Sequence, residues 1–523
     1  MGTEKVRDFH QARWNEPIVF ELSCPGERGI LIPLVDEEVE AAVGDVLSRL
    51  PPALRRREAP ALPELAQTRV LRHYLRLSQE NLGADLNVDI GQGTCTMKYN
   101  PKINERLARS PQMTELHPLQ PAETVQGILQ VMYEFEQMLK AISGLDRFSF
   151  QPGGGSQAIF TMASMIRAYH EARGDYPRRN EIITTIFSHP SNAAATAVAG
   201  FRILTVYPDR DGYPDVAALR EAVCERTAGL FITNPEDTGI FNPCIREFTR
   251  LVHEAGGLCA YDQANANGIL GITRAREADF DLCFFNLHKS FSSPHGCGGP
   301  GAAAVGAVEK LAPFLPVPVV AGDGEKYWLD YDRPLSIGKV REFYGVPQAV
   351  LKAYAWVLAL GAEGLREVAR VAVLNSNYLL KKVSEIRGVA VPYAEGKHRL
   401  EQVRYSWQPL TEETGVTSEE VGRRMADFGF HYWTSHHPWI VPEPFTLEPT
   451  ESYSKAELDE YIAGLEEVSR EAYENPEVVK QAPHNSTIHT IDTSVLDDPA
   501  RWAVTWRAYL KKKGRTRHDP PGH

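Results

Sequence analysis

The chain has 523 residues, with 56 basic and 68 acidic side chains and a formal net charge of −12. Hydrophobic residues make up 43% and charged residues 24%, which is the ordinary mixture of a soluble globular protein. An acidic chain without a clustered basic face is a poor candidate for binding nucleic acid or an anionic membrane. No uncharged apolar run approaches the ~20 residues that a membrane span needs.

The beginning of the chain and the cysteines indicate a reducing compartment. The opening MGTEKVRDFHQARWNE lacks the apolar core of a secretory signal. The 7 cysteines are scattered and form no CxxC pair, so they do not suggest a disulfide framework. We therefore expect a cytoplasmic protein.

Residues 1–120 are rich in proline and irregular, most clearly in PPALRRREAPALPELA at 51–66. The apolar pieces IVFEL (18–22) and ILIPLV (30–35) require burial. We therefore expect this part to be an N-terminal arm that wraps a larger body.

From Pro121 onward, helix-like and strand-like segments alternate. A helical pattern over 125–142 ends at Gly144. Short apolar strands separated by amphipathic helices predict an α/β fold with a mostly parallel sheet covered on both faces. The predicted strands are 182–187, 201–207, 229–233, 257–261 and 281–287, and the predicted helices are 191–200, 214–225 and 244–256.

Ligands of such sheets bind just beyond the carboxyl ends of the strands. At these ends the chain carries His189, Asn234, Asp262 and Lys289. Each residue alone is ordinary turn chemistry, but together they suit pyridoxal phosphate, which needs a lysine amine for a Schiff base and a carboxylate beside its ring nitrogen. Lys289 and Asp262 are candidates for these two roles. Asn234 could serve the phenolic oxygen, and His189 could lie flat on the ring.

A glycine-rich turn is the candidate site for the cofactor phosphate. QPGGGSQ (151–157) precedes a long helical pattern, and backbone N–H groups at a helix start attract anions. The turn is neither a GxxxxGK[ST] loop nor a GxGxxG motif, so nucleotide binding has little support. We expect the phosphate to be bound by Gly154, Gly155, Ser156 and Gln157.

Two further motifs have a structural explanation that competes with a functional one. GCGGPG (296–301) is equally consistent with a turn beside the cofactor and with a purely structural turn. HYWTSHH (431–437) holds three histidines but no carboxylate or cysteine at metal-ligand spacing, so we expect no metal site there.

Long strings of the chain, in order from about residue 17 to about residue 490, resemble the P-protein family, the subunit 2 (β-type) proteins of glycine dehydrogenase (decarboxylating) in the glycine cleavage system. The strings that carry the resemblance include RHYLRLSQENLG (72–83), CTMKYNPKINE (95–105), LHPLQPAETVQG (116–127), FNLHKSFSSPHGCGGPG (285–301), IGKVREFYG (337–345) and NPEVVKQAPH (475–484).

The resemblance implies a fold-type-I pyridoxal-phosphate transferase with a mostly parallel sheet, flanking helices and a smaller C-terminal α+β domain. We expect an arm over 1–120, a large cofactor-binding domain over 121–335, and a small domain and tail over 336–523. Lys289 would form the Schiff base, His189 would stack on the ring and Asp262 would pair with the ring nitrogen.

In that family the enzyme condenses with glycine, releases the carboxylate as carbon dioxide and passes the aminomethyl group to a lipoyl carrier protein. The implied partners are an amino-acid substrate, an α-type subunit and the lipoyl carrier, and we expect a homo- or hetero-oligomer. Besides the residues above, Ala264 and His288 are candidate cofactor contacts. Candidate substrate contacts are Thr96, Lys98, Asn100, Asn265 and Arg341, with Arg404 as a further carboxylate-binding side chain; the CTMKYNP stretch could equally be a packed segment of the arm.

Several positions beside the cofactor skeleton depart from the family's usual pattern. QPGGGSQAI (151–159) replaces QPAAGAHGE, TNPEDTG (233–239) replaces TNPNTLG, and Gln263 stands in place of a glycine. These departures keep open a second hypothesis, a stand-alone pyridoxal-phosphate lyase, decarboxylase or carbon–carbon bond-forming enzyme acting on another amino acid. A non-catalytic scaffold is a third, which the retained Lys289 and Asp262 disfavour.

Overall fold

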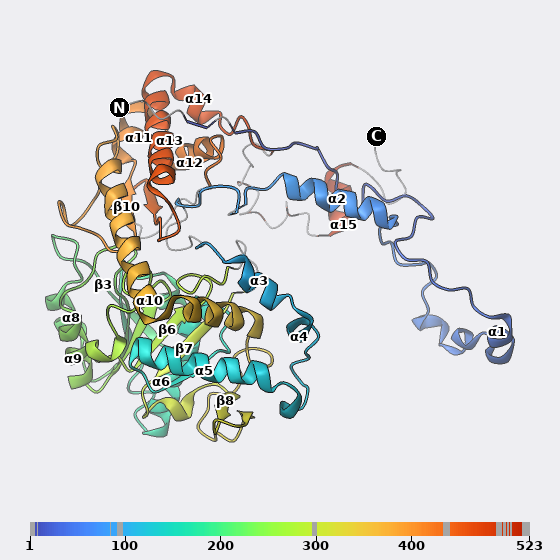
Figure 1. Cartoon of the computed structure of the whole chain (residues 1–523), viewed down its shortest axis with the longest axis horizontal. Helices are drawn as coiled ribbons and strands as arrows, with labels where there is room; N and C mark the ends of the chain where they lie inside the picture. Colours follow the sequence, from blue (N-terminus) through green and yellow to red (C-terminus); the bar gives the residue numbers. More distant parts are fainter. Residues whose placement is uncertain are drawn as a thin grey trace. The chain divides into compact units, whose positions relative to one another are not determined.

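The computed structural model describes residues 6–7, 9–83, 85–91, 98–294, 301–431, 440–487, 494, 498, 502 and 505–514 (Figure 1). The chain forms two compact units. One comprises Met1–Asp8 and Ala84–Ala482, and the other comprises Phe9–Gly83 and Pro483–His523. The three-part division expected from the sequence stays a prediction.

In its described residues the smaller unit holds the α-helices α1 (Glu37–Val43), α2 (Gln67–Gln79) and α15 (Trp506–Lys512). The N-terminal segment is therefore less irregular than the sequence suggested, because a 13-residue helix follows its proline-rich stretch. The expectation that ILIPLV is buried within the chain is wrong, since Leu31 is 84% exposed and Leu34 is 98% exposed.

The larger unit is built on a seven-stranded sheet in the order β1-β7-β6-β5-β4-β2-β3. Strands β2 to β6 pair in parallel, whereas β7 runs antiparallel to both β6 and β1. The mostly parallel α/β sheet predicted from the sequence is confirmed. The strands are β1 (Arg147–Ser149), β2 (Glu181–Thr185), β3 (Arg202–Val206), β4 (Thr227–Thr233), β5 (Leu258–Gln263), β6 (Leu282–Asn286) and β7 (Ala303–Ala307).

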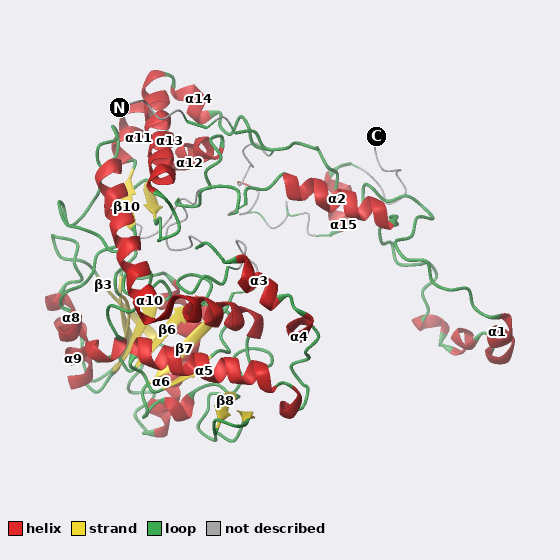
Figure 2. Cartoon of the chain, in the orientation of Figure 1, coloured by secondary structure: helices red, strands yellow, loops and turns green. Residues whose placement is uncertain are grey.

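Helices cover the sheet, as Figure 2 shows. Helix α6 packs on α7 and against β4 to β7, while α9 packs on α8 and against β4 and β5. Helix α5 ends where Gly144 takes the left-handed conformation with φ 75°, as its position in the sequence predicted. These helices are α5 (Gln126–Ser143), α6 (Gly155–Ala172), α7 (Ser191–Val198), α8 (Val216–Ala222) and α9 (Ile245–Glu254).

The apolar composition of the strands follows from this arrangement. Every residue of β2, β4, β5, β6 and β7 is buried, because helices lie over both faces, whereas edge strand β3 is partly exposed. Large side chains such as Phe231, Phe284 and Phe285 lie in this core. Each contributes roughly 1.5–3 kcal/mol through burial.

The C-terminal part of this unit has its own hydrophobic cluster around a two-stranded sheet of β10 and β11. Helix α10, drawn in ochre to orange in Figure 1, leads from the large sheet to this part and bends at Gly361, whose φ is 64°. The elements are α10 (Pro347–Val383), β10 (Val403–Ser406), α11 (Gln408–Thr414), α12 (Ser418–Ala426), β11 (Pro444–Leu447), α13 (Lys455–Glu474) and α14 (Pro476–Lys480).

The remaining elements of the larger unit are short. Strands β8 (Val319–Gly322) and β9 (Tyr327–Asp330) form a hairpin, and α3 (Lys102–Ala108) and α4 (Pro111–Thr114) precede α5. Within the described residues, no helix combines the length and the apolar character that crossing a membrane requires.

Candidate active site

The carboxyl ends of the central strands bring the predicted residues to one edge of the sheet. The parallel register places Thr233 opposite Asp262, and Asp262 opposite Phe284. Asp262 lies inside β5, one residue before its end, rather than after the strand as the sequence suggested. Lys289 follows β6 in a turn and is buried, 7% exposed. A lysine amine and a carboxyl group are thus both removed from water at the same sheet edge.

The environment of Asp262 raises the pKa of its carboxyl group toward neutral pH. Burial raises the pKa of this carboxyl group to about 6, and the charge of Asp237 raises it as well. The Ala264 N–H, which donates to Asp262 Oδ1 at 3.0 Å, the charge of Lys289 and a hydrogen bond from Asn192 oppose that rise in pKa. Lys289 therefore interacts electrostatically with Asp262, as the cofactor hypothesis requires.

His189 stands at the start of helix α7. The Ser191 N–H donates to its Nδ1 at 3.2 Å, and the Ser191 hydroxyl lies 2.7 Å from the same atom. Since Nδ1 accepts a backbone hydrogen bond, the proton of the neutral ring belongs on Nε2. The next residue, Asn192, is fully buried, and its Oδ1 has no hydrogen-bond partner among the described residues. The stacking role of His189 stays a prediction.

The glycine-rich turn lies at the start of helix α6. Gln157 accepts a hydrogen bond from the Gly153 N–H at 2.7 Å and donates to the Val340 carbonyl at 2.6 Å. A Cβ on Gly153 would lie 1.9 Å from Arg341 Nη1, so the guanidinium group lies against the bare glycine backbone. Ser156 is exposed. Arg341, expected at a substrate carboxylate, is thus placed beside the candidate phosphate turn, where its positive charge suits an anion.

His288, just before Lys289, lies against the same turn. Its Nδ1 accepts a hydrogen bond from the Ala302 N–H at 3.2 Å. A Cβ on Gly154 would lie 3.8 Å from the ring, and one on Gly301 would lie 3.0 Å from it. The glycines therefore permit the close approach of three chain segments around His288.

The Asn234 side chain is engaged with its own loop. It precedes a cis peptide bond to Pro235, accepts a hydrogen bond from the Asn242 N–H at 2.7 Å and donates to the Asn242 carbonyl at 3.4 Å. The described contacts thus give Asn234 a structural function, and its contact with the cofactor stays a prediction.

The substrate candidates from the CTMKYNP stretch are buried where they are described. Lys98 pairs with Glu451 at 3.1 Å and lies over the Trp356 ring, 4.8 Å from its centroid. Asn100 donates to Glu105 at 2.6 Å. Outside the described residues lie Thr96, all but Gly301 of GCGGPG (296–301), and all but His431 of HYWTSHH (431–437).

Reasoning from the sequence missed a buried acidic residue, Glu448, that follows β11. Its Oε1 accepts hydrogen bonds from Asn265 at 2.8 Å and from Asn267 at 2.6 Å, so the predicted substrate residue Asn265 contacts Glu448. Burial raises the pKa of Glu448 to about 7, while these two amides and the charges of Lys289 and Lys98 act in the opposite direction. No local motif marked this residue, because its partners are far away in the sequence.

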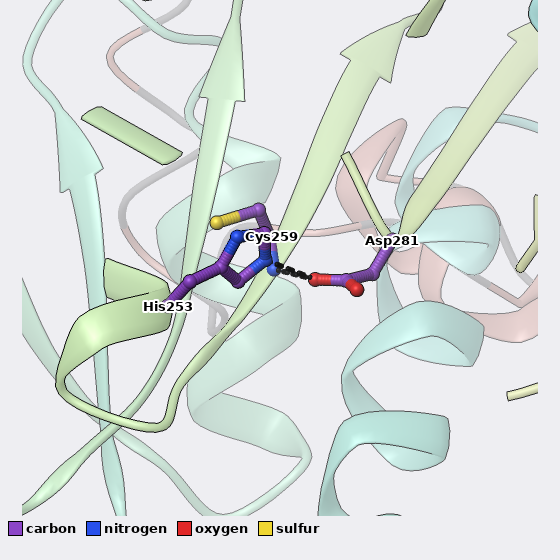
Figure 3. Close-up of side chains that lie close together, drawn as sticks. All are labelled: His253, Cys259 and Asp281. Atoms are coloured by element: carbon purple, nitrogen blue, oxygen red, sulfur yellow. Dashed lines mark hydrogen bonds and ion pairs between the residues drawn. The ribbon is translucent and has the colours of Figure 1, made fainter. Parts of the chain in front are cut away.

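A second group of polar side chains lies at the amino ends of the strands, where β5 begins and just before β6. His253, Cys259 and Asp281 offer ligand atoms within 4.8 Å of one another (Figure 3). The Asp281 carboxylate already accepts from the Cys259 N–H at 2.8 Å, contacts His253 Nε2 at 2.7 Å and pairs with Lys310 at 2.6 Å. Because Lys310 already pairs with the carboxylate, these side chains are better explained as contacts that hold β5, β6 and α9 together than as a metal site.

Comparison with known proteins gives relatives over nearly the whole chain. The protein of Pyrococcus abyssi named "Probable glycine dehydrogenase (decarboxylating) subunit 2" is 46% identical over 510 residues, covering 97% of this chain and 99% of the relative. A protein of the same name from Caldanaerobacter subterraneus is 45% identical over 476 residues, covering 91% of this chain and 96% of the relative.

Family models and solved structures agree with this result. Residues 368–490 match the model "Glycine dehydrogenase, C-terminal domain", and residues 148–302 match "Aminotransferase class-V". A structure of glycine decarboxylase (P-protein) of the glycine cleavage system superposes with a TM-score of 0.69 at 21% identity, covering 84% of this chain and 99% of that one. A sphingosine-1-phosphate lyase of Burkholderia pseudomallei superposes with a TM-score of 0.60 at 14% sequence identity, covering 81% of this chain and 94% of that one. At these identities the structures support the fold alone.

The described residues fit the cofactor that these comparisons imply. A buried lysine amine interacts with a buried carboxyl group, and bare glycine backbone beside a guanidinium group can receive a phosphate. Asn192 and Gln263 each keep a buried oxygen without a partner among the described residues, as expected of a site completed by a bound group. The chain belongs to the glycine dehydrogenase (decarboxylating) subunit 2 family and is a pyridoxal-phosphate-dependent enzyme of fold type I.

Proposed function

We propose that the chain decarboxylates glycine and passes the remaining aminomethyl group to the lipoyl group of a carrier protein, together with an α-type subunit. The observation that carries this proposal is the buried pair of Lys289 and Asp262 at the sheet edge, in a chain that matches subunit 2 relatives over nearly its full length.

The surroundings of the residues support the roles that we propose for them. Lys289, shielded from water, would hold the cofactor through its amine and exchange it for the amine of glycine. Bound pyridoxal phosphate supplies an electron sink for the bond that breaks at the α carbon. Asp262, whose pKa of about 6 leaves it largely ionised at neutral pH, would hold the proton on the ring nitrogen. Ala264 and Asn192 fix the orientation of that carboxylate.

The remaining positions would orient the bound groups. The His189 ring, held by Ser191 through Nδ1, would present its flat face to the cofactor. The N–H groups of Gly154 and Gly155 at the start of α6, with the Arg341 guanidinium beside Gly153, would receive the phosphate. Because these groups are fixed before binding, little reorganisation is needed when charge develops.

An exposed apolar segment of the smaller unit is the proposed binding site for the partner subunit. Ile30, Leu31, Ile32, Leu34 and Val35 are 67–98% exposed, and an apolar segment of this kind needs a cover. Because the relatives are named as subunit 2, the proposed cover is the α-type subunit. Leu34→Asp is expected to weaken co-purification with that subunit at least tenfold, whereas Val198→Asp, an exposed apolar position on α7, is the control. Equal binding by both variants would refute this assignment.

The proposed reaction is tested by the exchange of labelled bicarbonate into glycine. The purified chain, mixed with its α-type subunit and a lipoyl carrier protein, should incorporate labelled bicarbonate into the carboxyl group of glycine. Lys289→Ala should abolish the incorporation. If exchange is absent while another amino acid changes the visible absorbance of the bound cofactor, the chain acts on that amino acid instead, which is the second hypothesis that the departures from the family pattern keep open.

A further inference from the structure

Glu448 belongs to the C-terminal part of the larger unit yet is fastened to the loop after β5. Its backbone N–H donates to the Ile90 carbonyl at 3.0 Å, and its carboxyl group is completely buried. Both hydrogen bonds from Asn265 and Asn267 reach the same oxygen, Oε1. The other oxygen, Oε2, has no hydrogen-bond partner among the described residues.

The loop that holds Glu448 also contacts Asp262 and the chain beside Lys289. Ala264 donates to Asp262 at 3.0 Å, and the Ala266 N–H donates to the Ser290 hydroxyl at 2.7 Å. Ser290 is the neighbour of Lys289 in the chain. Residues 264–267 thus donate hydrogen bonds to the Asp262 carboxyl group, to the residue beside the lysine and to Glu448.

Of the two lysines near Glu448, Lys289 is the one whose chain neighbour Ser290 is bonded to the loop that holds Glu448. Lys289 and Lys98 attract the ionised carboxyl group, and Glu401, which is buried, interacts with it as another acid. Lys98 already has a partner in Glu451 at 3.1 Å. Burial, and after it the charge of Glu448, raise the pKa of Glu401 well above its ordinary value, which favours the neutral form of that group.

We propose that Glu448 is the counter-ion of the Lys289 nitrogen, a positioning residue that acts on the lysine and does not touch the substrate. The inference rests on the proposed role of Lys289 as the residue that holds the cofactor. When that nitrogen carries a proton, a buried positive charge needs a compensating negative one. Glu448 supplies this negative charge from the C-terminal part. Asp262 supplies a second negative charge from the sheet, and that charge would be paired with the ring nitrogen.

The test uses the full-length protein with its cofactor and without glycine. The visible absorbance of the bound cofactor is followed from about pH 6 to about pH 10, which reports the protonation of the Lys289 nitrogen. Glu448→Gln removes a negative charge while keeping the shape, so the titration is expected to move to lower pH by about one unit, a tenfold weaker hold on the proton. Glu451→Gln, which loses only the partner of Lys98, is expected to move it by less than about a third of that.

Failure of this inference and failure of the proposed function give different results. A yellow Glu448→Gln protein that titrates at the wild-type pH, or equal shifts in both variants, overturns the inference alone. A colourless wild-type protein overturns the proposed role of Lys289 and the inference with it. If Glu448→Gln does not fold, Asn267→Ala replaces it. Losing that amide makes Glu448 harder to ionise, so a smaller shift in the same direction supports the inference and no shift contradicts it.

Discussion

Replacing Asp262 with asparagine should make the cofactor-free chain more stable, by an amount that depends on pH. The pKa of this buried carboxyl group is raised from 3.8 to about 6, chiefly by burial. The folded chain therefore binds this proton more tightly than the unfolded chain does. The protonated group imposes no penalty at low pH, and stability is lost as the pH rises through about 6.

The size of the effect follows from the two pKa values. A rise from 3.8 to about 6 corresponds to about 3 kcal/mol of destabilisation once the pH is well above the folded-state value. At about pH 4 most of that penalty is absent. Asparagine carries no charge and can still accept the Ala264 N–H, so Asp262→Asn should stabilise the chain by about 2 kcal/mol more at pH 8 than at pH 4.

Urea unfolding of the cofactor-free protein at the two pH values measures this difference. Asp281→Asn is the matched control, because its pKa is lowered: hydrogen bonds and charges of His253 and Lys310 outweigh the effect of burial. That variant should be destabilised at pH 8, and the loss should shrink as the pH falls. A gain for Asp262→Asn that is the same at both pH values would refute the reasoning, because the carboxyl group would then carry no burial penalty.

Two glycine substitutions test other parts of the account. Gly153→Ala would put a Cβ 1.9 Å from Arg341, so the affinity for the cofactor, measured by equilibrium dialysis, should fall at least tenfold. The control is Gly127→Ala on an open helix surface, which should leave that affinity unchanged. Equal affinities of the two variants would mean that the phosphate binds elsewhere. Gly306→Ala would put a Cβ 2.4 Å from the Phe148 ring, so the free energy of unfolding should drop by about 2 kcal/mol. An unchanged urea midpoint would mean that the ring can move aside.

The central sheet could be predicted from the sequence because its parallel strands, apart from edge strand β3, are buried on both faces. The apolar runs at 230–232 and 282–285 marked β4 and β6 within a few residues. The antiparallel strands β1 and β7 were not predicted. One has 3 residues and the other consists of small residues next to a glycine-rich turn, and neither gives a strand signal.

Some residues of the candidate site could be predicted from the sequence, and others could not. Lys289 and Asp262 could be found because they stand at the ends of strands whose order along one edge follows from parallel pairing. Glu448 could not, since it follows β11 of a separate two-stranded sheet, and its position depends on how that part of the chain packs on the loop at 262–267. The placement of Arg341 against Gly153 likewise depends on tertiary packing, which no local pattern encodes.

The claim on which the account depends is that the amine of Lys289 holds the cofactor. Reducing the yellow protein with borohydride, digesting it and mapping the peptides by mass spectrometry measures this directly. We expect the reduced cofactor on the peptide that contains Lys289, and a colourless Lys289→Ala protein of unchanged fold. Cofactor found on any other lysine, or a Lys289→Ala protein that is still yellow, would contradict it.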